Sequence, residues 1–292
     1  MKATKKKEKT MATILDGKLT SAKVKEEVAA KIAAACADGR TPPCLAVVIV
    51  GDNPASKVYV ANKKKACEAV GIRSLSYELP GETSQEELLA LVDRLNADAA
   101  VNGILVQLPL PGHIDEQTVI ERISPAKDVD AFHPSNVGRI MLGLDGFAPC
   151  TPAGIMRLLA EYGISAAGKN CVVVGRSNIV GKPMALLLLK ANGTVSVCHS
   201  KTADLASHTK QADILVVAIG RAKFITADMV ADGAVIVDVG MNRVDGKLCG
   251  DVDFEPCAQK ASYITPVPGG VGPMTIAMLM ENTFRAWENA QR

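Results

Sequence analysis

The stretch that decides the fold runs from residue 172 to residue 183 and reads Val172-Val173-Val174-Gly175-Arg176-Ser177-Asn178-Ile179-Val180-Gly181-Lys182-Pro183. An apolar strand leads into a polar loop bounded by two glycines. The proline then stands where a helix can begin, because the first helical turn does not use the N–H that proline lacks. A strand, a loop and a helix in this order point backbone N–H groups at an anion, usually a phosphate. The stretch therefore predicts a site for a phosphorylated cofactor.

Strands alternate with helical segments along two stretches of the chain. In the first stretch, apolar strands fall at residues 44–50, 74–79 and 103–108, with helices near 55–70 and 84–96. In the second, strands fall near residues 171–174, 194–198, 213–219 and 234–239. This alternation is typical of βαβ units and a parallel sheet. We predict an α/β protein with an N-terminal three-layer α/β domain (residues 12–150 plus 274–292) and a Rossmann-type domain (residues 151–273), with a cleft between them.

Composition and charge narrow the class of protein. Of the 292 residues, 48% are hydrophobic and 3% are aromatic, so aliphatic side chains must build the cores, as in buried parallel strands. Residues 1–10 carry five lysines and one glutamate, which leaves the rest of the chain at a net charge of −2. We predict that residues 1–11 form a disordered basic leader without the apolar segment of a secretory signal, although a mitochondrial targeting role stays open. The charge of the folded part gives no support for a nucleic-acid partner.

Two further expectations concern membrane and metal. No run of about 18 apolar residues occurs, so we expect no membrane contact. The eight cysteines show no C-x-x-C spacing, and several stand within apolar strands. We therefore expect reduced thiols, a cytoplasmic protein and no metal site.

The end of the strand at 194–198 indicates which dinucleotide binds. In a Rossmann unit this strand meets the adenosine ribose, and NAD enzymes place Asp or Glu there. This chain has Ser200 and Lys201, and Arg176 stands in the preceding loop. A hydroxyl donor with cations suits a 2′-phosphate, which predicts NADP in preference to NAD. The alternative is that Arg176 and Lys201 are ordinary solvated charges. Glycines after the strands near 213–219 and 234–239, the second followed by Met241, predict the nicotinamide edge.

Two polar groups in the first domain are candidates for chemistry. Ser56, Tyr59 and Lys63 fall on one face of a predicted helix. From the spacing alone we favour a solvated basic face, because two further lysines follow. Gln107 ends a strongly apolar run, where a polar amide is either hydrogen-bonded or functional. The acidic pair Asp128 and Asp130 is either solvated or orients a heterocycle or a lysine.

Together these blocks resemble the bifunctional methylenetetrahydrofolate dehydrogenase/cyclohydrolase family over residues 12–288. The most specific blocks are Tyr59-x-x-x-Lys63, Val106-Gln107-Leu108-Pro109-Leu110-Pro111, Lys127-Asp128-Val129-Asp130, Gly175-Arg176-Ser177-x-x-Val180-Gly181-x-Pro183 and Pro268-Gly269-Gly270-Val271-Gly272-Pro273-Met274-Thr275. The resemblance implies a place in one-carbon folate metabolism and purine biosynthesis. It implies that 5,10-methylenetetrahydrofolate is oxidised with NADP+ to 5,10-methenyltetrahydrofolate, which water opens to 10-formyltetrahydrofolate.

The resemblance also implies the site residues. Lys63 is the central catalytic residue, Tyr59 borders the pterin, Gln107 tunes Lys63, and Asp130 holds the pterin ring. The rest of the folate pocket is expected from Val106, Leu108, Pro268, Gly272 and Pro273. Contacts with NADP are expected from Gly175, Arg176, Ser177, Ser200 and Met241. The family usually forms homodimers. One rival hypothesis is a monofunctional dehydrogenase, which the joint presence of Lys63 and Gln107 disfavours. Another is a non-catalytic dinucleotide-binding module, which is disfavoured by the intact set of Tyr59, Lys63, Gln107 and Asp130.

Overall fold

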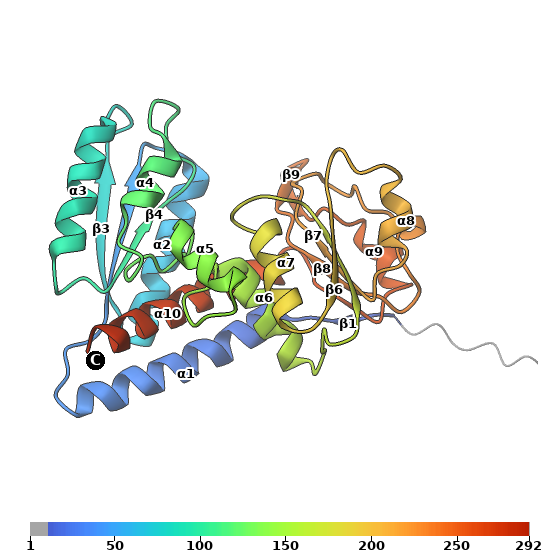
Figure 1. Cartoon of the computed structure of the whole chain (residues 1–292), viewed down its shortest axis with the longest axis horizontal. Coiled ribbons are helices and arrows are strands. Elements are labelled where there is room, and N and C mark those ends of the chain that lie inside the picture. Colours follow the sequence, from blue (N-terminus) through green and yellow to red (C-terminus); the bar gives the residue numbers. More distant parts are fainter. Residues whose placement is uncertain (1–10, 292) are drawn as a thin grey trace, which may run out of the picture. The chain divides into compact units, whose positions relative to one another are not determined.

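The computed structural model describes residues 11–291 and divides them into two units (Figure 1). We call the first, residues 18–154 and 273–291, the three-stranded unit. We call the second, residues 11–17 and 155–272, the six-stranded unit. The predicted leader lies outside the described residues apart from Met11.

The three-stranded unit is built on a parallel sheet in the order β3-β2-β4. Its strands are β2 (Cys44–Val50), β3 (Arg73–Leu79) and β4 (Gly103–Val106). Every residue of β2 is buried, which explains its unbroken apolar sequence. Helix α2 (Pro54–Val70) leads from β2 to β3, and α3 (Gln85–Ala97) leads from β3 across β2 to β4. Right-handed crossovers in opposite directions place these helices on opposite faces, which gives the predicted three layers.

Helix α3 covers one face of this sheet. Its start is set by a capping box, in which Ser84 accepts from the N–H of Glu87 and the Glu87 side chain accepts from the N–H of Ser84. Its buried side chains Leu88, Leu91, Val92 and Leu95 pack with alternate residues of β2. The other helices of the unit are α1 (Gly17–Ala37), α4 (Glu116–Arg122), α5 (Pro134–Met141) and α10 (Val271–Ala290).

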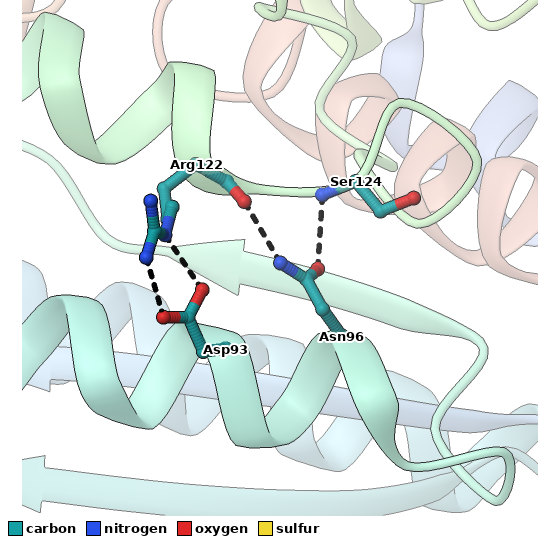
Figure 2. Close-up of polar contacts among 4 residues, drawn as sticks. All are labelled: Asp93, Asn96, Arg122 and Ser124. Atoms are coloured by element: carbon teal, nitrogen blue, oxygen red, sulfur yellow. Dashed lines mark hydrogen bonds and ion pairs between the residues drawn. The ribbon is translucent and has the colours of Figure 1, made fainter.

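Helices α3 and α4 are joined by polar side chains (Figure 2). Arg122 at the end of α4 makes two parallel bonds to the Asp93 carboxylate, at 2.6 and 2.7 Å. Asn96 donates to the carbonyl oxygen of Arg122 at 2.8 Å and accepts from the N–H of Ser124 at 2.9 Å. The chain that leaves α4 toward residues 127–130 is therefore fixed to α3 at its first residues.

The six-stranded unit is a parallel sheet in the order β1-β11-β8-β7-β5-β6. Its strands are β1 (Thr13–Ile14), β5 (Asn170–Val174), β6 (Thr194–Cys198), β7 (Ile214–Val217), β8 (Val235–Asp238) and β11 (Tyr263–Ile264). The elements between them are α6 (Cys150–Glu161), α7 (Gly181–Lys190), α8 (Leu205–Thr209), the 3-10 helix η1 (Ala227–Met229), the hairpin β9 (Asn242–Val244) and β10 (Lys247–Cys249), and α9 (Phe254–Ala258). The α/β fold class predicted from the sequence is confirmed.

One local feature differs from the sequence expectations. Residues 12–17 were expected with the first domain, but Thr13 and Ile14 pair with Tyr263 and Ile264 at the edge of the larger sheet. A two-residue strand has no period from which pairing could be read. Helix α6 begins at Cys150, one residue before Thr151. The Thr151 hydroxyl lies 2.9 Å from that of Thr275 on α10.

The loop after β5 needs its two glycines for backbone packing. Gly175 has φ +131°, and a Cβ there would overlap the carbonyl oxygen of Ala218. A Cβ on Gly181 would overlap the carbonyl oxygen of Gly175, because the loop folds back on itself before α7. The five-residue spacing of the glycines thus follows from a loop that closes against its own beginning.

Candidate active site

Lys63 and Gln107 form the polar centre of the three-stranded unit. Lys63 lies on α2 with 7% of its surface exposed, and its Nζ donates to Gln107 Oε1 at 3.0 Å. The N–H of Gln107 donates to the Val48 carbonyl at 2.8 Å, which holds its backbone at the carboxyl end of the sheet. Gln107 Nε2 donates to the Leu108 carbonyl at 2.7 Å, which turns Oε1 toward the lysine. The buried ammonium therefore has a fixed neutral acceptor.

Tyr59 and Ser56 lie on the same helix as Lys63. Tyr59 is half-buried one turn before the lysine, and burial raises the pKa of its phenol. Ser56 is buried, and its N–H donates to Asn53 Oδ1 at 3.1 Å in the first turn of α2. The helix thus carries a tyrosine and a lysine in an environment that is partly withdrawn from water.

Two residues of the 127–130 motif have structural partners. Lys127 Nζ donates to three carbonyl oxygens at the end of α3, those of residues 95, 96 and 98, at 3.0, 2.8 and 2.7 Å. The buried Asp128 accepts from the N–H of His133 at 2.8 Å and from Asn136 Nδ2 at 2.9 Å. Burial raises the pKa of Asp128, and these two donors oppose the shift. Lys127 and Asp128 therefore shape the chain on either side, and Asp130 is left as the candidate for chemistry.

Asp130 lies beside a buried thiol. Cys150, the first residue of α6, is 1% exposed, and its Sγ donates to the Val129 carbonyl at 3.4 Å. The pKa of this thiol is raised well above its ordinary value, first by burial and then by the neighbouring Asp130 carboxylate, while the charge of Lys63 opposes the shift. Lys63, Asp130 and Cys150 therefore form one electrostatic group.

Asn282 on α10 fixes the backbone next to this group. Its Nδ2 donates to the Val129 carbonyl at 2.8 Å and to the Ala148 carbonyl at 3.0 Å. No motif in the sequence marks Cys150 or Asn282, which contact the 129–130 segment from far along the chain. The one available signal was a polar amide within a largely apolar helix.

The other residues expected in the folate pocket are spread over both units. Val106 is buried in the core under α3, and Leu108 packs against the same apolar cluster. The two side chains therefore anchor the backbone on either side of Gln107. Pro268 follows β11 in the six-stranded unit, and Gly272 lies near Met241, since a Cβ added to it would be 3.6 Å from Met241 Cε. Pro273 is the first residue of the C-terminal segment of the three-stranded unit.

A cavity of about 450 Å³ opens in the six-stranded unit at the carboxyl ends of β5, β6 and β7. Strand β5 has β6 on one side and β7 on the other, so this is the point at which the strand order reverses and where doubly wound sheets bind ligands. The volume suits a nucleotide-sized ligand. The lining residues are Val174, Gly175, Arg176, His199, Ser200, Thr202, Leu205, Ala218, Ile219, Arg221 and Phe224.

Three residues predicted to bind the cofactor, Gly175, Arg176 and Ser200, line this cavity. Ser177 instead hydrogen-bonds the backbone where α7 begins, because its Oγ accepts from the N–H groups of Val180 and Gly181 at 3.2 and 3.3 Å. The hydroxyl therefore occupies donors at the helix N-terminus that the sequence argument left for a phosphate. Arg221 and Phe224 are an unpredicted pair in the wall, with the guanidinium 4.2 Å from the ring centroid.

The comparisons with known proteins agree with this arrangement. The model of the tetrahydrofolate dehydrogenase/cyclohydrolase catalytic domain matches residues 15–130, and that of the NAD(P)-binding domain of the same family matches residues 149–291. The chain belongs to this family. The family resemblance seen in the sequence is confirmed.

Relatives of the family resemble the chain over nearly its whole length. The bifunctional protein FolD of Campylobacter curvus is 61% identical over 94% of this chain and 96% of its own. The crystal structure of the bifunctional FolD dehydrogenase/cyclohydrolase from Campylobacter jejuni has a TM-score of 0.93 at 56% identity, covering 95% and 99% of the two chains. The Trypanosoma brucei enzyme, solved with NADP cofactor and inhibitor, has a TM-score of 0.92 at 38% identity, covering 97% and 99%.

Three further observations concern the described residues as a group. Across residues 11–291, every helix is too short or too polar to cross a membrane. In the same range, no group of three or more His, Cys, Asp or Glu side chains is placed to bind a metal ion. The eight cysteines are free thiols, and six of them are buried.

Asp238 is a buried carboxylate at the end of β8, just before the loop that carries Met241. It is 4% exposed and accepts from the N–H groups of Gly240, Asp251 and Val252, each at 2.9 Å. Burial raises the pKa of Asp238 to about 6, and the three N–H donors oppose the shift. The family's cofactor unit therefore contains an internal acid that titrates just below neutral pH.

We predict that Asp238 makes the stability of the protein pH-dependent. Between about pH 4 and pH 6 the folded chain binds more protons at this group than the unfolded chain, whose ordinary value is 3.8. The contribution of Asp238 to the free energy of unfolding therefore falls as the pH rises through this window, by on the order of 2 kcal/mol. Urea unfolding of wild type and Asp238→Asn from pH 4.5 to 7 measures this contribution. The free energy of unfolding of wild type minus that of Asp238→Asn should fall as the pH rises. Parallel profiles would contradict the assignment.

Proposed function

We propose that the chain catalyses two successive reactions in one-carbon folate metabolism. It oxidises 5,10-methylenetetrahydrofolate with NADP+ to 5,10-methenyltetrahydrofolate, and it hydrolyses that product to 10-formyltetrahydrofolate. The observation that carries the proposal is the buried Lys63, whose Nζ is held by Gln107 at 3.0 Å. The cavity lined by Arg176 and Ser200 in the six-stranded unit supports NADP as the oxidant.

The oxidation depends on positioning. NADP+, when bound, supplies the hydride acceptor. The methylene carbon loses a hydride and becomes a cationic methenyl carbon, and no protein acid or base takes part. The residues must therefore bring donor and acceptor within about 3.5 Å, and that alignment is the main source of rate. We assign the binding of NADP to Gly175, Arg176, Ser177, Ser200 and Met241, with Ser177 acting through its hydrogen bonds to the backbone at the start of α7.

The hydrolysis needs a base, and Lys63 is the residue we assign to it. A cationic substrate beside the lysine disfavours the ammonium form, so the bound methenyl group promotes a neutral amine. Water then adds to the methenyl carbon while a proton passes to Lys63 Nζ. The added hydroxyl group then loses its proton as the carbon–oxygen double bond forms, while the bond from this carbon to one of its two nitrogens breaks. That nitrogen takes up a proton, the formyl group stays on the other nitrogen, and one proton is released overall. Gln107 Oε1 keeps Nζ in place throughout.

The pterin ring is assigned to the side chains around Lys63. Tyr59 borders the ring and Asp130 holds it by hydrogen bonds. The hydrogen bond from Asn282 Nδ2 to the Val129 carbonyl oxygen supports the position of Asp130, as does the Cys150 thiol beside it. The remaining contacts are assigned to Val106, Leu108, Pro268, Gly272 and Pro273.

We also infer the organisation of the active protein. The three-stranded unit serves as the folate domain and the six-stranded unit as the NADP domain. Family resemblance supports a homodimer, and the eight free cysteines support a cytoplasmic location.

A spectroscopic assay tests the function directly. Purified protein is given methylenetetrahydrofolate with NADP+ or with NAD+, while the methenyl absorbance and its decay are followed. A methenyl signal with NADP+ that then decays is the expected result. Absence of the signal with both cofactors refutes the dehydrogenase, and a signal that persists at the uncatalysed rate of decay refutes the cyclohydrolase.

Substitution of Lys63 tests its role as the base. Lys63→Met removes the proton acceptor with little change in volume, and general-base catalysis contributes about 100-fold or more. We expect hydrolysis of supplied methenyltetrahydrofolate to fall by at least that factor. Lys64→Met is the matched control, because Lys64 is the exposed neighbour on the same helix. Normal hydrolysis by Lys63→Met would contradict the assignment, as would equal losses in the two variants.

Substitution of Arg176 tests the choice of cofactor. Loss of a hydrogen bond between charged groups costs about 1.5–3 kcal/mol, so Arg176→Ala should raise the KM for NADP+ by roughly 10-fold or more. The KM for NAD+, which lacks the 2′-phosphate, should change less than about twofold, since no such bond is lost. Lys201→Ala, measured in parallel, separates the two cations. If Arg176→Ala raises the KM for both cofactors equally, Arg176 does not bind the 2′-phosphate.

A further inference from the structure

Asp251 is a fully buried carboxylate that binds the backbone of one cavity loop. It is 0% exposed and precedes α9. Its Oδ2 accepts from the N–H groups of Ile219 and Gly220 at 2.7 and 3.0 Å, and its Oδ1 accepts from the N–H of Arg221 at 2.8 Å. Three consecutive peptide donors therefore converge on one side chain.

The same carboxylate reaches the next loop along the sheet. Asn242 Nδ2, just after Met241, donates to Asp251 Oδ1 at 2.9 Å. The backbone N–H of Asp251 donates in turn to Asp238 Oδ1, which also accepts from Gly240. The loops that follow β7 and β8 are thus tied together by two carboxylates.

These contacts leave no space for another side chain. A Cβ on Gly240 would overlap the Asp251 carboxylate, and one on Gly250 would overlap that of Asp238. Within residues 11–291, both carboxylates accept hydrogen bonds from backbone N–H groups, and Asp251 also accepts from the Asn242 side chain. In the same range neither carboxylate forms an ion pair with a lysine or an arginine. Burying two such groups is costly unless their hydrogen bonds are complete. An arrangement that needs this many bonds fixes the loops closely.

The bound loop forms a wall of the cofactor cavity. Ile219 and Arg221 line the cavity, and the Arg221 guanidinium lies over Phe224 in the same wall. Rotation of the peptides at 219–221 would move both side chains, and a shift at Asn242 would move Met241. Asp251 therefore controls two segments of the site without itself reaching the cavity lining.

We propose that Asp251 is a positioning residue for NADP, which holds the 219–221 loop in the shape that binds the cofactor. The inference rests on the proposed function of the six-stranded unit. The proposal predicts different effects on the two activities, because hydrolysis is assigned to Lys63 in the other unit. Loss of the carboxylate should weaken cofactor binding and dehydrogenation while hydrolysis of supplied methenyltetrahydrofolate continues.

The experiment compares Asp251→Asn with wild type. Asparagine keeps one acceptor oxygen and turns an NH2 group toward N–H donors, so about two hydrogen bonds are lost. Because the 219–221 loop is then held by fewer bonds, the Kd for NADP+ from calorimetry should rise roughly 10-fold or more. Amide hydrogen exchange in the cofactor-free protein should accelerate by a similar factor at residues 219–221, because their acceptor is gone. The rate of methenyltetrahydrofolate hydrolysis should stay within about twofold, since Lys63 and Gln107 keep their bond.

Two other variants make the test independent of folding defects. Asn242→Ala removes one bond to the same carboxylate, so it should raise the Kd for NADP+ by about threefold to tenfold. Asp245→Asn is the matched control, because it makes the same chemical change at an exposed turn residue with a positive φ that asparagine tolerates. It should bind NADP+ as wild type does.

Wild-type affinity for NADP+ in both Asp251→Asn and Asn242→Ala would overturn the inference. An equal loss of hydrolysis and of NADP+ binding in Asp251→Asn would also overturn it, since the role would then be general stability. Failure of the wild-type protein to bind NADP+ or to oxidise methylenetetrahydrofolate would instead refute the proposed function.

Discussion

The parallel pairing of the strands is the constraint on which the rest of the structure depends. In both sheets the strands run the same way, so every loop after a strand begins at the same edge. Gln107 follows β4 at this edge of one sheet, and Arg176, Ser200 and Arg221 follow three neighbouring strands of the other. Buried apolar strands therefore deliver polar side chains to two places, and the chemistry of each place follows from which residues end the strands.

Hydrogen bonds from side chains to peptide groups then fix the loops. Lys127 donates to carbonyl oxygens at the end of α3. Asp128 accepts from the N–H of His133, just before α5. Asn282 donates to the carbonyl oxygen of Val129, next to Asp130. In the other unit Asp238 and Asp251 do the same for the loops beside the cavity. Each unit uses buried polar groups as supports and leaves a few neighbouring side chains to meet ligands.

Much of the fold could be predicted from the sequence, because buried parallel strands are continuous apolar runs with glycines or polar residues at their ends. The strand expected at 103–108 was nearly right: β4 stops at Val106, although Gln107 still donates to Val48. Gln107 could be singled out because an amide ending an apolar run is unusual. Cys150, Asn282 and Asp251 could not, because each binds residues far away along the chain and leaves no local pattern. Lys127 and Asp128 were grouped with Asp130 because they are adjacent in the sequence, yet their hydrogen bonds to backbone groups give them a structural role.

The division of the chain into units has a consequence for how the two activities are linked. Neither unit is a single segment, because the chain passes from one to the other near residues 17, 154 and 272. A fragment that ends after residue 154 carries Lys63, Gln107 and Asp130 but lacks α10, and with it the amide that holds Val129. No single break in the chain yields a complete folate unit and a complete cofactor unit. A single break in the chain is therefore expected to disturb at least one of the two units.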